Sequence, residues 1–211
     1  MKKGLLIVLS GPSGAGKGVI CKKILELDKD INLSVSCTTR KAREGEVDGQ
    51  SYFFLSDKEF TEMIGQDGFL EHAEFVNNRY GTPKDHVFDI VNNGKDIILE
   101  IEVQGAAMVK DRYPDAVLIF IVPPSMKELK DRLKGRGTET DKQTDRRLRR
   151  AIKELELLSS YDYVIRNDEV ERAARKALDI ISAEKCAVKR NLGLTKLLIK
   201  GEKIVWWLNL N

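Results

Sequence analysis

The sequence has little of what marks several broad classes of protein. Its three cysteines, Cys21, Cys37 and Cys186, are far apart and odd in number, so we expect neither disulfides nor a thiolate metal site and place the protein in the cytoplasm. No apolar run approaches the roughly 20 residues that a membrane-spanning helix needs. The formal net charge of +3 is too small to indicate a nucleic-acid partner. The composition therefore predicts neither a membrane protein nor a nucleic-acid-binding protein.

The 211 residues are enough for one sizeable core with small inserted subdomains. Apolar residues make up 42% of the chain and charged residues 33%, which is typical of a globular protein. Neither an internal repeat nor a low-complexity segment is present, so we expect one domain over residues 1–211.

Residues 11–17 match the pattern G-x-x-x-x-G-K. An apolar run at residues 5–9 precedes them, and residues 19–25 carry apolar side chains at helical spacing, so the glycines lie between a predicted strand and a predicted helix. Glycine lets the backbone curl and direct several N–H groups at an anion, and Lys17 adds a full positive charge. A glycine-rich turn with a solvated lysine is the alternative, but the complete strand–loop–helix context favours a nucleoside triphosphate site.

The residue after Lys17 departs from the usual pattern. Ser or Thr commonly stands there and offers Mg²⁺ a hydroxyl, whereas this chain has Gly18 followed by Val19. If Mg²⁺ is used, we expect it to be held through the nucleotide, through water or by another side chain.

Buried strands that alternate with helices predict a parallel α/β sheet. Short extended segments between about residues 37 and 90 interrupt that alternation and predict a small inserted β-rich subdomain, in which Ser56 and Glu59 form a capping box that opens a helix. A hairpin that turns near Gly201 is expected in the tail, which carries two adjacent tryptophans. The strands predicted for the main sheet are residues 5–9, 33–36, 96–101, 116–122 and 163–165.

A second set of side chains suits a phosphate group. Guanidinium forks bind phosphate in a bidentate manner and a tyrosine hydroxyl can donate one more bond, and this set comprises Arg40, Arg43, Tyr52 and Tyr80. Two solvated arginines and two core tyrosines are the alternative. Beside the phosphate-binding loop (P-loop) predicted at residues 11–17, the set indicates a second phosphorylated ligand.

Glu71, Thr82 and Glu102 are candidates for recognising a base. Guanine presents two adjacent N–H donors, which a carboxylate matches, and an oxygen acceptor, to which a hydroxyl can donate. Adenine lacks that donor pair, so a buried carboxylate would disfavour it.

Arginines crowd into and behind a polar loop at residues 135–143. A solvated helix face is the ordinary explanation of such a run. We favour a lid that closes over a triphosphate and neutralises charge on the transferred group, and within it we single out Arg132, Arg136 and Arg147.

Eight sequence blocks at consistent spacing carry a family resemblance. The chain resembles the guanylate kinases, P-loop nucleoside monophosphate kinases that phosphorylate GMP from ATP. The blocks run in order between about residues 4 and 187, and they are residues 11–17, 38–46, 52–54, 69–71, 80–82, 100–105, 135–139 and 163–168.

The resemblance implies an α/β fold with a three-layer parallel sheet, helices on both faces, an inserted GMP-binding subdomain and a mobile lid. The core is expected at about residues 1–36, 95–132 and 151–187, the insertion at about 37–94, the lid at about 133–150 and the tail at about 188–211. The implied substrates are ATP and GMP, with dGMP as a possible acceptor, and the implied cofactor is Mg²⁺. Monomer and homo-oligomer remain equally open.

The resemblance also implies roles for individual residues. The residues expected to bind ATP are Gly11, Pro12, Ser13, Gly14, Ala15, Gly16, Lys17, Gly18 and Asn167. Those expected to bind GMP are Ser36, Arg40, Arg43, Tyr52, Glu71, Tyr80, Gly81, Thr82, Glu100 and Glu102. Those expected to act in catalysis are Lys17, Arg40, Arg43, Arg132, Arg136 and Arg147, with Glu100 as the candidate metal ligand.

The chain departs from the family pattern in three ways. Ala42 replaces a usual proline, Gly18 and Val19 remove the P-loop hydroxyl, and Glu100 is one methylene longer than a common aspartate. Two other functions stay open: a guanylate-kinase-like module that binds phosphorylated peptides, and a P-loop kinase for another phosphorylated metabolite. The intact Lys17 argues against the module, and Glu71 with Thr82 argues for guanine.

Overall fold

The computed structural model describes residues 3–75, 77–134 and 141–200. Five strands form the main sheet, and all neighbouring pairs in it are parallel. The central strand pairs Val8 with Leu99 on one side and with Leu118 on the other. The predicted parallel α/β fold is therefore confirmed. In spatial order the strands are β2 (Asn32–Leu33), β7 (Ile97–Glu100), β1 (Leu6–Ser10), β8 (Val117–Val122) and β9 (Tyr163–Arg166).

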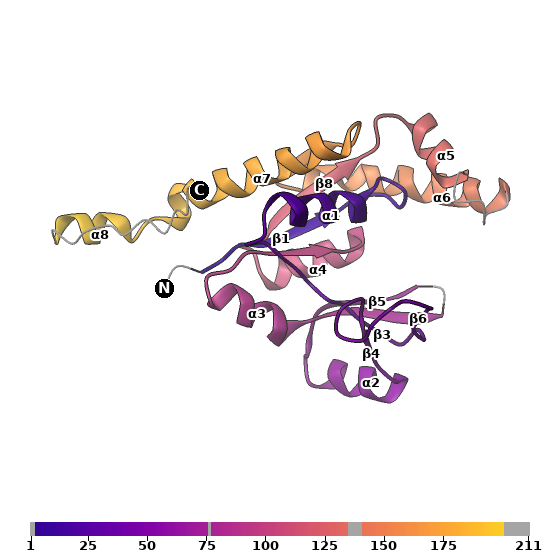
Figure 1. Ribbon diagram of the computed structural model, residues 1–211, viewed down its shortest axis with the longest axis horizontal. Helices are drawn as coiled ribbons and strands as arrows, with labels where there is room; N and C mark the ends of the chain where they lie inside the picture. Colours follow the sequence, from indigo (N-terminus) through magenta and orange to yellow (C-terminus); the bar gives the residue numbers. More distant parts are fainter. Residues whose placement is uncertain (1–2, 76, 135–140, 201–211) are drawn as a thin grey trace.

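Helices cover both faces of this sheet, as the alternation of side chains along β1 requires. Ile7 and Leu9 pack into one apolar cluster with α1 (Lys17–Leu27) and α7 (Val170–Cys186). The intervening Leu6 and Val8 pack into a second cluster on the opposite face. That second cluster includes side chains from α3 (Lys84–Asn92) and α4 (Val103–Arg112). Figure 1 shows the resulting three layers.

A second sheet of four strands lies below the main sheet in the view of Figure 1. Phe69 stacks on Phe60 of α2 (Asp57–Gly65), with ring centroids 4.5 Å apart, and these two rings anchor a small separate core. The capping box predicted at Ser56 is confirmed, because both of its reciprocal hydrogen bonds form. In spatial order the strands are β4 (Phe53–Phe54), β3 (Cys37–Thr38), β6 (Asn78–Pro83) and β5 (Phe69–Phe75).

The chain passes from one sheet to the other shortly after β2, and here the sequence prediction was wrong. The strand expected at residues 33–36 is only Asn32–Leu33 in the structure. Ser34 donates one last backbone bond to Ile98, and Cys37 already belongs to the second sheet. The residues between them connect the two sheets instead of lengthening the first.

Helices α5 (Met126–Lys134) and α6 (Asp141–Leu155) flank the loop that was predicted to be a lid. A 3-10 helix (Glu156–Ser160) follows α6. No helix in the described part of the chain has the length and apolar character to cross a membrane.

Beyond α7 the chain leads away from the sheet (Figure 1). The hairpin predicted in the tail is wrong over its described part, because α8 (Leu194–Ile199) is helical there. Gly201, Trp206 and Trp207 lie outside the described residues.

Candidate functional site

The P-loop follows β1 at the carboxyl edge of the main sheet, and its backbone conformation requires glycine. Gly11 and Gly16 have φ angles of +140° and +95°, in the region that L side chains rarely adopt. A Cβ atom at Gly11 would lie 2.2 Å from the carbonyl oxygen of Ile121 in β8. Gly16 then stands as the N-cap of α1, so the loop leads directly into a helix N-terminus, which favours anions.

Lys17 is buried at the start of α1, and its ammonium group bends back over the loop. Its Nζ atom donates a 2.7 Å hydrogen bond to the carbonyl oxygen of Gly11 and lies 3.8 Å from Oε1 of Glu102. The positive charge is thereby fixed at the mouth of the loop, where a phosphate chain would bind.

Glu100 lies against the position from which the P-loop hydroxyl is missing. A Cβ atom at Gly18 would be 3.3 Å from both carboxylate oxygens of Glu100. Neighbouring protein atoms desolvate this carboxyl and raise the pKa of Glu100, and the positive charge of Lys17 opposes that shift. Among the described residues, no group of three or more His, Cys, Asp or Glu side chains gathers at a metal-binding spacing.

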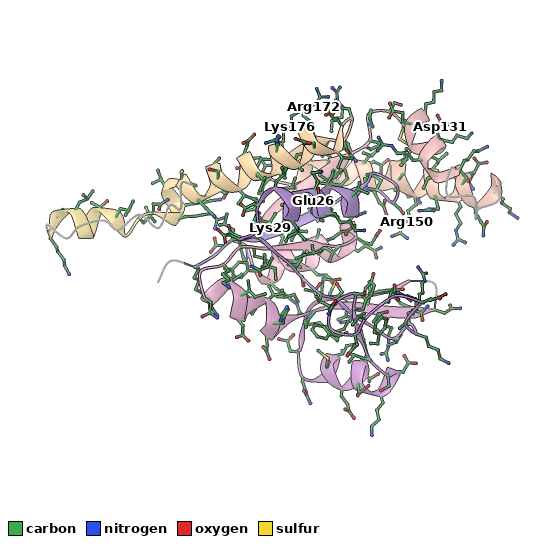
Figure 2. The ribbon with its side chains drawn as sticks, in the orientation of Figure 1. Glu26, Lys29, Asp131, Arg150, Arg172 and Lys176 are labelled. Atoms are coloured by element: carbon green, nitrogen blue, oxygen red, sulfur yellow. The ribbon has the colours of Figure 1, made fainter. Side chains whose placement is uncertain are left out.

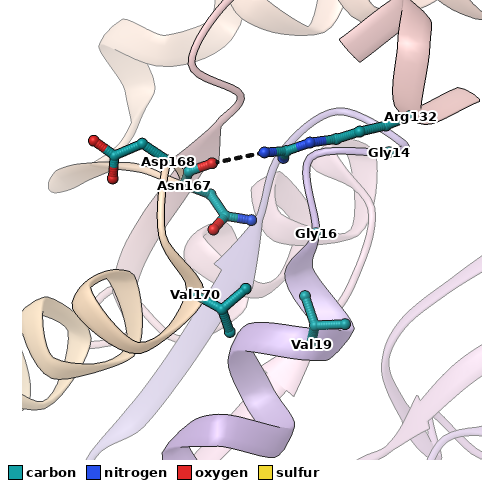
Figure 3. Close-up of a pocket in the computed structure, with 7 residues that line it drawn as sticks. All are labelled: Gly14, Gly16, Val19, Arg132, Asn167, Asp168 and Val170. Carbon is teal, nitrogen blue, oxygen red and sulfur yellow. Dashed lines mark hydrogen bonds between the residues drawn. The ribbon is translucent and has the colours of Figure 1, made fainter. Parts of the chain in front are cut away.

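A cavity of about 330 Å³ lies on the outer side of the P-loop (Figure 3). Asn167 is buried in its wall and donates from Nδ2 to the carbonyl oxygen of Ala15 at 2.7 Å. Arg132 donates from Nη2 to the backbone oxygen of Asn167 at 3.0 Å. The residues that line the cavity are Gly14, Gly16, Val19, Arg132, Asn167, Asp168 and Val170.

Asn167, predicted to bind ATP, and Arg132, predicted to act in catalysis, therefore share one cavity beside the P-loop. The carboxylate of Asp168 in the same wall pairs with Arg166 and Arg172, which hold its pKa well below its usual range. Two arginines thus accompany the negative charge of Asp168 in the wall of this cavity.

Arg147 extends from α6 to the P-loop. Its Nη2 atom donates to the hydroxyl of Ser13 at 2.6 Å, so the structure joins a predicted lid arginine to the predicted triphosphate site. Arg136, the other arginine predicted there, lies outside the described residues.

The predicted phosphate-binding arginine of the second sheet is held by a carboxylate that sequence reasoning missed. Nη2 of Arg40 lies 2.8 and 2.9 Å from the two carboxylate oxygens of Glu46, which also accepts the backbone N–H of Arg43 at 2.8 Å. The pKa of Arg40 is raised by Glu46, and the pKa of Glu46 is lowered by Arg40. The regular spacing of Arg40, Arg43 and Glu46 along one loop was the available signal.

Two tyrosines complete this set. The guanidinium carbon of Arg40 lies 5.5 Å from the ring centroid of Tyr52, and the Tyr52 and Tyr80 rings meet edge to face at 6.1 Å. Ser36 precedes β3 beside them, and its carbonyl oxygen accepts the backbone N–H of Phe53. The structure therefore brings Arg40, Tyr52 and Tyr80 together, as predicted from the sequence.

The candidate base-recognition residues converge on the N-terminus of α4. Thr82 donates from its hydroxyl to Oε1 of Glu71 at 2.6 Å, and both residues are buried. A Cβ atom at Gly105, in the first turn of α4, would lie 2.6 Å from Oε2 of Glu71. Glu102 is the N-cap of the same helix. Burial raises the pKa of Glu71, and the Thr82 bond opposes that shift.

Glu102 also connects this region to the P-loop and to α6. Its Oε1 atom is the one near Lys17, and its Oε2 atom lies 3.2 Å from Nη2 of Arg150. Arg150 also donates from Nε to Glu154 at 2.7 Å. The Arg150–Glu154 pair has the spacing of an ordinary helix-surface pair, so its spacing does not indicate that Arg150 reaches Glu102.

Comparison with known proteins agrees with this arrangement. A family model described as guanylate kinase matches residues 3–184. A guanylate kinase of Caldanaerobacter subterraneus is 53% identical over 193 residues, which is 92% of this chain and 94% of the relative. One of Clostridium acetobutylicum is 56% identical over 189 residues, which is 90% of each chain.

A solved structure agrees as well. The crystal structure of guanylate kinase from Anaplasma phagocytophilum aligns with a TM-score of 0.76 at 36% identity and covers 93% of this chain and 94% of that one. The family model spans more than half of the sequence, and the relatives match along most of their length. The chain therefore belongs to the guanylate kinase family.

Proposed function

We propose that this protein transfers the γ-phosphoryl group of ATP to GMP, giving ADP and GDP, with the site residues divided between the two nucleotides as follows. Family membership supports the reaction. The observation that carries the assignment is the Glu71–Thr82 pair, a buried carboxylate with a hydroxyl partner near the N-terminus of α4. That pair suits guanine, whereas the P-loop at the end of β1 suits a triphosphate.

ATP is assigned to the P-loop and to the cavity on its outer side. Its phosphates would bind the loop N–H groups and Lys17. Arg147 also contacts this loop, through its hydrogen bond with Ser13. The adenine would enter the cavity between Arg132 and Asn167, which two valine side chains make partly apolar.

GMP is assigned to the second sheet. Its phosphate would meet Arg40 and Arg43 with the hydroxyls of Tyr52 and Tyr80, and Ser36 lies beside them. Its base would lie against Glu71, Thr82 and Glu102, next to Gly81. Deoxyguanosine monophosphate presents the same base and phosphate, so it is proposed as a further acceptor.

The reaction needs no general base, because the attacking phosphate oxygen is already anionic at neutral pH. Its difficulty is to bring two polyanions together in line. The residues proposed to neutralise their charge are Lys17, Arg40, Arg43, Arg132, Arg136 and Arg147.

Mg²⁺ is proposed as the cofactor, with Glu100 as the side chain that holds it. Carboxylate oxygen is a preferred ligand of Mg²⁺, and this carboxylate lies against Gly18, where the P-loop hydroxyl is missing. When bound, the ion would neutralise charge on the phosphates.

The free thiols of Cys21, Cys37 and Cys186 support the proposed location in the reducing cytoplasm.

Replacing Glu100 with glutamine is expected to raise the Mg²⁺ concentration for half-maximal rate by about 10- to 100-fold, because the amide is a weaker ligand than the carboxylate. Titration of the rate with Mg²⁺ measures the shift, and calorimetry of ATP binding without metal gives the control. An unchanged Mg²⁺ requirement would remove Glu100 from the proposed metal site.

The acceptor assignment is tested by ADP release from Mg-ATP with GMP, AMP, CMP or UMP, for the unchanged protein and for Glu71→Gln. We expect turnover with GMP, and a loss of roughly 10²-fold in kcat/KM for GMP in the variant, because a charged hydrogen-bond acceptor is lost. The preference for GMP over AMP should shrink as well.

Glu74→Gln is the matched control, since Glu74 lies on the same strand with an exposed side chain. Turnover of the unchanged protein with another acceptor would discard the guanine assignment. An undiminished preference for GMP in Glu71→Gln would exclude Glu71 from base recognition.

A further inference from the structure

Four charged side chains of alternating sign join the P-loop to α6. Lys17 lies 3.8 Å from Oε1 of Glu102, Arg150 lies 3.2 Å from Oε2 of Glu102, and Arg150 donates to Glu154 at 2.7 Å. The series links three elements: α1, the N-cap of α4 and α6. In Figure 2 Arg150 lies on the side of α6 that faces the second sheet.

Arg150 is aimed at Glu102 by its own helix. Glu154 stands one turn further along α6, is buried, and accepts from Nε of Arg150, which leaves Nη2 for Glu102. A guanidinium can bind two carboxylates through different nitrogens of one rigid plane, whereas a lysine ammonium has no such fixed geometry. Burial raises the pKa of Glu154, and Arg150 opposes that shift.

Glu102 is therefore shared unequally between two cations. The 3.2 Å separation from Arg150 is a hydrogen bond, whereas the 3.8 Å separation from Lys17 is longer than one. Without Arg150, Coulomb attraction would draw the carboxylate of Glu102 onto Lys17. A carboxylate in direct contact with the lysine would neutralise part of its charge and so weaken its attraction for phosphate.

We propose that Arg150 is a positioning residue that holds the Glu102 carboxylate away from Lys17, so that the lysine charge stays available to phosphate and the carboxylate stays available to the base. The inference rests on the proposed function for the assignment of ATP to Lys17 and of the base to Glu102. It gives α6 a second task beside that of Arg147, because the same helix then contacts both Ser13 of the P-loop and Glu102.

The test measures the affinity for a non-hydrolysable ATP analogue by calorimetry in Arg150→Gln, with Arg149→Gln as the matched control. Arg149 is the exposed neighbour on the same helix, so the net charge changes equally. We expect Arg150→Gln to weaken the analogue about three- to fivefold, the effect of a partly exposed ion pair, and Arg149→Gln to weaken it less than about twofold.

A double-mutant cycle separates positioning from general damage. In a Glu102→Gln background there is no carboxylate to be drawn to Lys17, so Arg150→Gln should add less than about twofold. Arg150→Lys keeps the charge without the rigid fork, and its affinity should fall between those of the unchanged protein and Arg150→Gln. Melting temperatures show whether each variant is folded.

Equal effects of Arg150→Gln and Arg149→Gln would overturn the inference, and so would full additivity with Glu102→Gln. Calorimetry with GMP alone tests the proposed function separately from the proposed role of Arg150. Absence of GMP binding by the unchanged protein would contradict the acceptor assignment, while the cycle on the ATP analogue would still decide the role of Arg150.

Discussion

Replacing Lys17 with alanine is expected to lower kcat for GMP phosphorylation by about 10³-fold, because one fully charged, preorganised donor is removed from the transferring phosphoryl group. The structure makes this ammonium hard to replace. It is buried, it is fixed on the carbonyl of Gly11, and it lies at the start of α1 where the loop N–H groups converge.

The measurement is kcat from ADP release at saturating ATP and GMP, with the GMP affinity taken from calorimetry. Lys22→Ala is the matched control, since Lys22 is exposed on the same helix and its loss changes the net charge equally. A rate for Lys17→Ala within tenfold of the unchanged protein would exclude Lys17 from the chemical step.

Replacing Arg147 with alanine is expected to lower kcat by about 10³-fold while the affinity for GMP changes less than about twofold, the pattern of a group that acts on the transferring phosphate. The contact with Ser13 is the physical reason for placing Arg147 so close to the chemistry. The residues around Arg40 that are proposed to bind the GMP phosphate belong to the second sheet, so the affinity for GMP should be retained.

Arg146→Ala, an exposed neighbour on α6, supplies the control for the loss of one positive charge from this helix. Arg147 would lose its proposed role if its variant kept the rate of the unchanged protein. A fall in GMP affinity as large as the fall in kcat would instead indicate a structural defect shared by both sites.

Local signals made most of the fold predictable. The P-loop depends on consecutive residues, as does the capping box at Ser56, so both could be found from the sequence alone. The parallel sheet followed from buried strands that alternate with helices. The prediction failed at residues 34–36, because only the pairing of Cys37 with Gly81 shows that the chain has already changed sheets.

The candidate site was predictable wherever one segment or a family resemblance carried it. Glu71 and Thr82 are opposite partners in the β5–β6 register, a relation that no local pattern encodes, and the resemblance supplied it. Glu46 was missed because the loop sequence does not show which charged side chain pairs with Arg40, and Arg150 was missed because its contact with Glu102 crosses the fold. Arg150 is 48 positions from Glu102, and its i,i+4 partner Glu154 suggests a surface pair.

The hydrogen bond between Thr82 and Glu71 determines which hydrogen-bond donors and acceptors a bound base would meet. A threonine hydroxyl has a single proton, and here it is directed at Glu71, so it is not available to a base oxygen while that bond persists. Entry of guanine would exchange partners: the hydroxyl turns to O6 and the freed carboxylate oxygen accepts a base N–H, with no hydrogen bond lost. Adenine presents the opposite polarity at both positions, so the same exchange would leave a donor facing a donor and an acceptor facing an acceptor.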